Sequence, residues 1–223
     1  MPRTFAIGDI HGCDVALETL LSKLGLTSAD TCVVLGDVID RGPDSKRAIE
    51  LLIELQKTCR LIFLMGNHEE MLFDTLAGGV WAQNWPLYGG DAMLQSYGGR
   101  LDQIPEEHLE FLRSGLNFFE AGDNIFVHAN LEPGVPLERQ STEWLRWTKL
   151  TGQEKPYAEG KRVICGHTAL REGKPSVFPG WACIDTFCYG GKYLTCVNVD
   201  TDEVYQARQT GAFRDGLSLR DFA

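Results

Sequence analysis

Short apolar runs that end in glycine followed at once by a polar residue constrain this chain more than any other feature. Four runs finish with the pairs Gly8-Asp9, Gly36-Asp37, Gly66-Asn67 and Gly166-His167, and a fifth finishes with Val127-His128. Such runs, rich in Val, Ile, Leu and Phe, are typical of buried β-strands. Glycine lets backbones approach closely, and ligands in α/β sheets bind beside the carboxyl ends of strands. We therefore expect these five tips to converge on one site.

Two stretches between the first three runs have the periodicity of amphipathic helices. Apolar side chains recur with a helical period in residues 14–26, and again in residues 44–57, where Asp44 or Ser45 is the expected cap. Strands that alternate with helices favour a parallel sheet with right-handed crossovers. The first third of the chain therefore predicts a β-α-β-α-β arrangement.

A mostly helical middle and a strand-rich end follow this first third. Further β-like runs occupy residues 124–129, 162–167, 181–186, 193–199 and 203–209. Residues 200–203 predict the turn of a hairpin between the last two runs. Because the chain shows no internal repeat, low-complexity tract or linker, one domain over residues 1–223 is expected.

The charge of the chain limits the partners that it can have. Its 223 residues carry a formal net charge of −10, whereas proteins that bind nucleic acid or anionic membranes are basic on the binding face. We therefore expect no nucleic-acid or membrane partner. An anionic substrate would need a few placed cations or metal ions.

The cysteines and the first residues indicate a reducing compartment. Seven cysteines form an odd set without a CxxC pair, so neither a disulfide framework nor a zinc ribbon is expected. The first apolar stretch is too short for a signal peptide, and no segment approaches the roughly 20 apolar residues of a membrane helix. These features predict buried, reduced thiols in a cytoplasmic protein.

The histidines are concentrated at the strand tips. The chain has five histidines, and only His108, in a polar helical stretch, lies away from the tips, where we expect a solvated surface residue. A single histidine after a strand is structural more often than it is a ligand. Packing alone does not explain why the other four all follow strand ends: His11, His68, His128 and His167.

The residue types at the tips predict a metal site. Carboxylate, imidazole and amide ligands without thiolate suit manganese, iron or zinc ions in a non-structural site. Asp9 and His11 are two residues apart, so on an extended strand end they face the same side and can share an ion with Asp37. A second ion, bridged by a carboxylate such as that of Asp37, would take its ligands from the other tips: Asn67, His128 and His167. Two such ions lower the pKa of a bridging water and clamp a phosphoryl oxygen.

Two arginines are candidates for binding a phosphate group. Arg41 follows Asp37 by four residues, and Arg146 lies between two tryptophans. A guanidinium forms bidentate bonds with phosphate oxygens and stabilises the charge of a transition state. The alternatives are a loop salt bridge for Arg41 and plain surface packing for Arg146.

The ordered motifs resemble those of a known family. "GDIHG", "GDVIDRG", "GNHE", "VHA" and "CGHT" follow one another as in the phosphoprotein phosphatase family of metallophosphoesterases. The short length, "RGPDS" and "IDT…YGGKYLTCVNVD" are most similar to the small bacterial and phage serine/threonine phosphatases. The resemblance extends over nearly the whole chain, from Asp9 to about Asp200.

This resemblance implies a fold and a set of residue roles. The fold would be α/β, with a central β-sandwich flanked by helices in four α/β/β/α layers. His68 would be the general acid, oriented by Asp40, and Arg41 and Arg146 would bind the phosphate. One ion would be held by Asp9, His11 and Asp37, and the other by Asp37, Asn67, His128 and His167.

The resemblance also implies a reaction. The chain would be a metal-dependent phosphomonoesterase, most similar to serine/threonine protein phosphatases, with two divalent ions, of which manganese is favoured over iron or zinc. A hydroxide bridging the ions would attack phosphorus directly while His68 protonates the leaving oxygen. We expect Asp40 to keep His68 protonated to higher pH than a free histidine. The substrate would be a phosphorylated protein or a small phosphoester.

Two alternatives differ from this interpretation in testable ways. A symmetrical hydrolase of dinucleoside polyphosphates, such as diadenosine tetraphosphate, would share nearly all the metal ligands. Those relatives usually lack the counterpart of Asp40, because a phosphate leaving group needs less help from a proton, and the presence of Asp40 favours phosphomonoesters. A non-catalytic binding module is disfavoured, since every expected position is filled.

Some residues depart from the family pattern or have two interpretations. Phe187 and Cys188 stand where small residues are expected, which affects the shape of the nearby groove. The aromatic residues of segment 78–99 either shape substrate access or pack in the ordinary way: Trp81, Trp85 and Tyr88. Glu69 and Glu70 are interpreted mainly as first-turn helix residues, favoured by the helix dipole.

Overall fold

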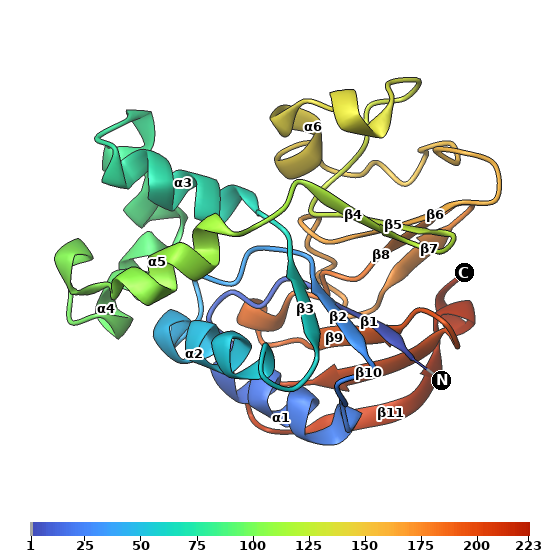
Figure 1. Cartoon of the computed structure of the whole chain (residues 1–223), viewed down its shortest axis with the longest axis horizontal. Helices are drawn as coiled ribbons and strands as arrows, with labels where there is room; N and C mark the ends of the chain where they lie inside the picture. Colours follow the sequence, from blue (N-terminus) through green and yellow to red (C-terminus); the bar gives the residue numbers. More distant parts are fainter. Residues whose placement is uncertain (1) are drawn as a thin grey trace.

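Two β-sheets packed face to face form the centre of the computed structural model, which describes residues 2–223 (Figure 1). The first sheet has the order β11-β10-β9-β1-β2-β3. Its strands are β1 (Thr4–Ile7), β2 (Thr31–Val34), β3 (Arg60–Phe63), β9 (Leu194–Asn198), β10 (Glu203–Ala207) and β11 (Phe213–Ser218). β1, β2 and β3 are parallel, which confirms the predicted β-α-β-α-β arrangement, and β9 runs antiparallel to β1.

The second sheet has the order β4-β5-β6-β8-β7. Its strands are β4 (Phe118–Ala121), β5 (Asn124–Val127), β6 (Arg162–Cys165), β7 (Ser176–Phe178) and β8 (Trp181–Cys183). β5, β6 and β8 are parallel to one another, so their carboxyl ends lie at the same edge.

Helices lie on the outer faces of the two sheets, and a further group of helices packs beside α2. They are α1 (Asp14–Leu24), α2 (Ser45–Leu55), α3 (Asn67–Leu76), α4 (Gly90–Ser96), α5 (Glu106–Arg113) and α6 (Thr142–Arg146). Figure 1 shows α1 and α2 against the first sheet and α6 beside the second. As predicted, the carboxylate of Asp44 caps α2 by accepting the N–H of Arg47.

Successive side chains along the strands contribute alternately to two cores, one between the sheets and one under the helices. In β1, Phe5 and Ile7 pack with the helices on the outer face, whereas Ala6 packs between the sheets. β2 repeats this pattern, with Val33 between the sheets and both neighbours outside. Because successive side chains of a strand point to opposite faces, each strand serves two cores. The predicted four-layer sandwich is confirmed.

Several local predictions can be checked directly. Residues 200–203 do connect β9 and β10 as a hairpin, with Asn198 paired to Glu203. All seven cysteines are buried and free. His108 is not a solvated residue, because it is 5% exposed and its Nδ1 lies 2.7 Å from the hydroxyl of Tyr97. Within residues 2–223, no helix combines the length and apolar character needed to cross a membrane.

Candidate metal and phosphate site

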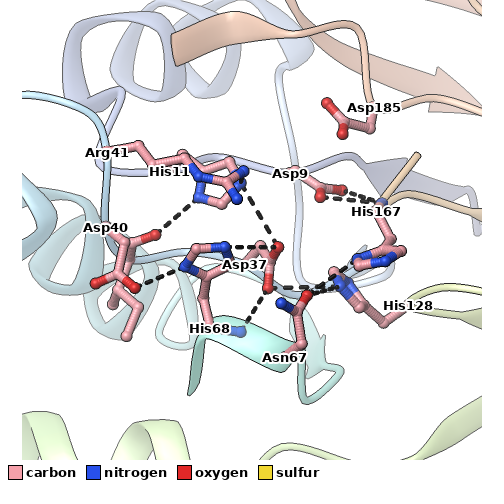
Figure 2. A network of polar contacts seen from close by, with 12 residues as sticks. Asp9, His11, Asp37, Asp40, Arg41, Asn67, His68, His128, His167 and Asp185 are labelled. Atoms are coloured by element: carbon pink, nitrogen blue, oxygen red, sulfur yellow. Dashed lines mark hydrogen bonds and ion pairs between the residues drawn. The ribbon is translucent and has the colours of Figure 1, made fainter. Parts of the chain in front are cut away.

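The five strand tips meet at one place, as the sequence predicts (Figure 2). The side-chain oxygen of Asn67 lies 3.1 Å from Nε2 of His128 and 3.0 Å from Nδ1 of His167. The two carboxylate oxygens of Asp37 lie 3.5 Å from Nε2 of His11 and 3.5 Å from Nε2 of His128. Asp37 therefore contacts side chains from both sheets.

Glycine before the ligand is required sterically, as two of these tips show most clearly. A Cβ atom on Gly66 would lie 2.2 Å from a carboxylate oxygen of Asp37, and one on Gly166 would lie 1.9 Å from a carboxylate oxygen of Asp9. Real Cβ atoms do not approach other atoms so closely, so any larger residue would displace these carboxylates. The Gly-polar pairs of the sequence thus have a steric cause.

Three histidines present an unprotonated nitrogen to the cluster. Each uses its other ring nitrogen as a donor to a backbone carbonyl, which can only accept, and this fixes the tautomer. Burial lowers the pKa of all three imidazoles, to about 3 for His128 and about 4 for His167, and keeps them neutral. The bonds are His11 Nδ1 to Ile39 at 2.9 Å, His128 Nδ1 to Leu35 at 2.8 Å and His167 Nε2 to Trp147 at 2.9 Å.

Two overlapping groups of buried side chains fit a pair of divalent ions. The ligand atoms of His11, Asp37 and His68 lie within 4.8 Å of one another, and so do those of Asp37, His128 and His167. Asp37 belongs to both groups, as expected of a bridging ligand. Neutral imidazoles with a shared carboxylate are the donors that such ions prefer.

Asp9 lies outside the two groups of ligand atoms described above. The first group contains His68 where Asp9 was expected, and the carboxylate oxygens of Asp9 accept the backbone N–H of His167 at 3.1 and 3.0 Å. The assumption of an extended strand end fails because His11 has a φ of 47°. Burial beside Asp185 and Asp37 raises the pKa of Asp9 well above its usual value. A divalent ion would offset this repulsion between buried carboxylates.

The backbone around the site is unusually strained. Among residues 2–223, seven non-glycine residues have positive φ, a region that side chains with a Cβ disfavour. Five of them lie at the strand tips: His11, Asp37, Asp40, Arg41 and His167. Strain of this kind persists where the surrounding structure enforces it and clusters at functional sites.

His68, Asp40 and Trp85 form a buried chain of polar contacts. Nδ1 of His68 lies 2.6 Å from a carboxylate oxygen of Asp40, and the indole N–H of Trp85 donates to the same oxygen at 2.8 Å. His68 Nε2 and the other oxygen of Asp40 are buried without a protein hydrogen-bond partner. The contact predicted for His68 and Asp40 is therefore present, and Nε2 is left to face the site.

The protonation of this pair differs from the prediction. Burial lowers the pKa of His68 to about 4, since loss of water outweighs the attraction of Asp37 for the imidazolium. Burial also raises the pKa of Asp40. Asp40 therefore does not hold His68 protonated above the range of a free histidine, because both partners are cut off from water.

Arg41 points its charge into the site. Its guanidinium lies 2.9 Å from Nε2 of His11 and 4.7 Å from the ring centre of Tyr189. Backbone carbonyls of Tyr88 and Gly89 accept its Nε–H and backbone N–H at 3.3 and 3.0 Å. No ion pair among residues 2–223 involves Arg41, so the alternative of a loop salt bridge is not observed.

Arg146 is more constrained than Arg41. It forms an ion pair with Glu70 at 2.7 Å and donates to the side chain of Asn117 at 2.6 Å, while its side chain is 15% exposed. The same glutamate accepts the indole N–H of Trp147 at 3.4 Å. Glu70 is therefore more than a first-turn helix residue, and a phosphate bound by Arg146 would share it with this carboxylate.

The model of the calcineurin-like phosphoesterase family matches residues 2–197. The chain belongs to this family. Because it has the fold and the clustered ligand types of the family, it is a metal-dependent phosphoesterase.

Several sequence relatives of this phosphoesterase are named as hydrolases of dinucleoside tetraphosphates. It is 27% identical to the asymmetrical bis(5'-nucleosyl)-tetraphosphatase PrpE of Oceanobacillus iheyensis over 215 residues, which cover 85% of each chain. It is 30% identical over 142 residues to the symmetrical bis(5'-nucleosyl)-tetraphosphatase of Nitrosomonas europaea, covering 61% of this chain. The match spans only 47% of that second relative.

Solved structures of several activities share the fold. A candidate diadenosine tetraphosphatase superposes with a TM-score of 0.67 at 24% identity, covering 96% of this chain and 92% of its own. A serine/threonine phosphatase from Saccharomyces cerevisiae gives a TM-score of 0.62 at 18% identity over 88% of this chain and 72% of its own. At these identities the likeness shows the fold alone.

The sequence does not predict the contacts that three residues make at this phosphoesterase site. Glu69 is fully buried and accepts the backbone N–H groups of Asp37, Val38 and Gly66 at 3.0, 2.8 and 3.0 Å, so it fixes the loop that carries the bridging carboxylate. Burial raises the pKa of Asp185, which lies beside Asp9, to about 7. Trp85 was one of three aromatic residues given two interpretations. The family motifs include Glu69 and Asp185, but nothing local in the sequence indicates these contacts.

Proposed function

We propose that this phosphoesterase hydrolyses dinucleoside tetraphosphates at a P–O–P linkage. The carrying observation is the 27% identity to an asymmetrical bis(5'-nucleosyl)-tetraphosphatase over 85% of both chains. Similarity that covers most of both chains supports a shared substrate class better than a match limited to the metal motifs. The interpretation weighed second from the sequence is thus favoured over the protein phosphatase interpretation.

The residues assigned to the site fit this chemistry. Two divalent ions, with manganese favoured, would neutralise phosphate charge and lower the pKa of a bound water. Asp9, with its carboxylate beside the His167 tip, would complete the ligand set when ions are bound. The assigned metal ligands are Asp9, His11, Asp37, Asn67, His128 and His167.

The remaining site residues would bind the substrate and move a proton. Arg41, whose guanidinium has no carboxylate partner, would bind the oxygens of the phosphate under attack, and Arg146 would bind a neighbouring phosphate oxygen. His68 would protonate the leaving oxygen from Nε2, because an anionic substrate beside it favours the charged imidazolium, while Asp40 holds Nδ1.

A second function is favoured by one specific observation. The buried contact between His68 and Asp40 supplies a positioned proton donor, which an alkoxide leaving group needs more than a phosphate does. A phosphomonoesterase that acts on phosphoserine or phosphothreonine is therefore the second candidate.

One assay distinguishes the two functions. The manganese-loaded chain is incubated with diadenosine tetraphosphate and with a phosphoserine peptide, and kcat/KM is measured for each. We expect a higher value for the dinucleotide, with ADP alone marking symmetrical cleavage, and ATP with AMP marking asymmetrical cleavage. Asp37→Asn is the inactive control for both substrates. A higher value for the phosphopeptide would refute the proposal in favour of the second candidate.

A further inference from the structure

The segment from Val80 to Tyr88 exposes apolar side chains beside the site. It forms two short 3₁₀ turns, Val80–Gln83 and Trp85–Tyr88. Val80 is 81% exposed, Leu87 82% and Tyr88 50%, so this short segment holds three of the six large apolar side chains that the described residues expose most. A cluster of exposed apolar side chains does not stabilise the fold and is typical of a binding surface.

The inner side of the same segment is fixed to the candidate active site. Trp85 is 1% exposed and its indole N–H donates to Asp40. The carbonyls of Tyr88 and Gly89 accept two N–H groups of Arg41. A Cβ on Gly89 would lie 2.5 Å from the side chain of Arg41, which shows how closely the two backbones approach. The exposed outer side is therefore held next to the phosphate-binding arginine.

Three aromatic rings extend this surface across the site. We define the aromatic rim as Trp81, Tyr88 and Trp147. Tyr88 packs edge-on against Trp81, with ring centres 5.4 Å apart at 87°, and Trp81 stacks on Trp147 at 5.2 Å and 12°. The carbonyl of Trp147 accepts the ring N–H of His167. The aromatic rim thus connects the neighbourhood of Arg41 with that of His167.

We propose that the aromatic rim binds a purine base of the substrate, with Tyr88 as the stacking surface. Trp81 and Trp147 cover one another, whereas Tyr88 is 50% exposed to solvent. A base attached through ribose to a phosphate at Arg41 is a flat, uncharged group, and an aromatic ring binds such a face without reading its hydrogen-bonding edge. This inference rests on the proposed function, and it adds Tyr88 as the side chain that would make the enzyme prefer nucleotide substrates.

A substrate pair with and without a base tests the proposal. For Tyr88→Ala we expect kcat/KM for diadenosine tetraphosphate to fall roughly 5- to 100-fold, the range of one lost base–aromatic stack. Hydrolysis of inorganic tripolyphosphate should change less than about threefold, since the backbone carbonyl that holds Arg41 remains. Tyr88→Phe should restore the activity on the dinucleotide, because the ring face is kept.

Binding without turnover gives a second readout. ADP should quench tryptophan fluorescence in the wild type, and its Kd should rise in Tyr88→Ala by the same factor as the loss in kcat/KM. The control is Val15→Ala on α1. Val15 is an apolar residue that is 38% exposed, and it lies near Gly211 in the connection between β10 and β11. This control should leave both substrates and the Kd unchanged.

The outcomes separate this inference from the proposed function. If Tyr88→Ala cleaves the dinucleotide as the wild type does, or loses equal activity on both substrates, the base site is wrong while the proposed function stands. If Tyr88→Ala instead weakens only the cleavage of a phosphopeptide, the surface binds peptide and the base site is again wrong. If the wild type itself leaves the dinucleotide intact, the proposed function has failed.

Discussion

Removal of the indole N–H of Trp85 tests whether a buried hydrogen bond positions the proposed general acid. Trp85 and His68 contact the same oxygen of Asp40, at 2.8 and 2.6 Å, and the other oxygen of Asp40 has no protein partner. In Trp85→Phe the carboxylate would keep only one side-chain partner, and its orientation toward His68 would no longer be fixed.

The expected size of the effect follows from this geometry. A lost hydrogen bond to a charged or buried group costs roughly 1.5–3 kcal/mol. If the bond positions His68 in the transition state, this cost corresponds to a rate loss of about 10- to 150-fold. The smaller phenylalanine ring also removes packing contacts, which lowers the free energy of unfolding. This loss of stability is the same whichever substrate is used. Stability and catalysis must therefore be measured separately.

The assay compares two leaving groups. An alkyl phosphate leaves as a strong base and needs a proton, whereas para-nitrophenyl phosphate leaves as a weak base and does not. We expect Trp85→Phe to lose about 10- to 150-fold in kcat/KM on the alkyl substrate and less than about threefold on the aryl substrate. The metal affinity, measured by calorimetry with Mn²⁺, should be unchanged.

Trp181 provides a matched control for this substitution. It is 2% exposed and its indole N–H donates to the carbonyl of Lys155 at 3.0 Å, in the outer core of the second sheet. Trp181→Phe should lower the stability to urea by a similar amount and spare both rates. Equal losses on the two leaving groups in Trp85→Phe, or the same selectivity in Trp181→Phe, would refute the reasoning.

Three further outcomes are expected. Asp37→Asn should weaken Mn²⁺ binding at least about 100-fold by calorimetry, since it removes a shared ligand, whereas Asp215→Asn on the exposed edge should not change it. Glu69→Gln should weaken Mn²⁺ binding roughly 10- to 100-fold, because it disturbs the loop without removing a ligand; wild-type affinity would exclude that role. The Arg3 guanidinium lowers the pKa of Asp30 below its usual 3.8, so the native state binds fewer protons than the unfolded chain. The resulting stability is present above 3.8 and is lost progressively as pH falls from there through the lower pKa of the folded state. Urea unfolding between pH 5 and pH 3 should therefore show a steeper loss for the wild type than for Asp30→Asn, and parallel curves would contradict the assignment.

The strands that sequence reasoning missed share one physical property. β4, β7 and β11 all lie at edges of their sheets. An edge strand packs on few neighbours and tolerates charge and glycine, as in the "FRDGLS" of β11, so it lacks the continuous apolar run that marks a central strand. The central strands were found because burial on both faces requires such a run.

The site was predicted where short sequence spacing encodes it and missed where it does not. Each tip residue follows its own strand within a few residues, so the convergence could be inferred from the Gly-polar pairs. The contacts of Glu69 with Asp37 and of Trp85 with Asp40 join residues 32 and 45 positions apart. They depend on how α3 and the 3₁₀ turns pack, which periodicity does not determine.

The presence of Asp40 was the main sequence argument for phosphomonoesters, and its burial changes the weight of that argument. A positioned acid assists any leaving oxygen in proportion to the basicity of that oxygen. An alkoxide leaving group needs such an acid, and the acid does not slow the departure of a phosphate leaving group. The His68–Asp40 contact therefore widens the range of leaving groups without selecting against dinucleotides. Selection must then come from groups that contact the rest of the substrate. The exposed ring of Tyr88, held beside Arg41 by its own backbone, meets that requirement. Leaving-group range and substrate preference would therefore be set by opposite sides of the same short segment, with Trp85 facing in and Tyr88 facing out.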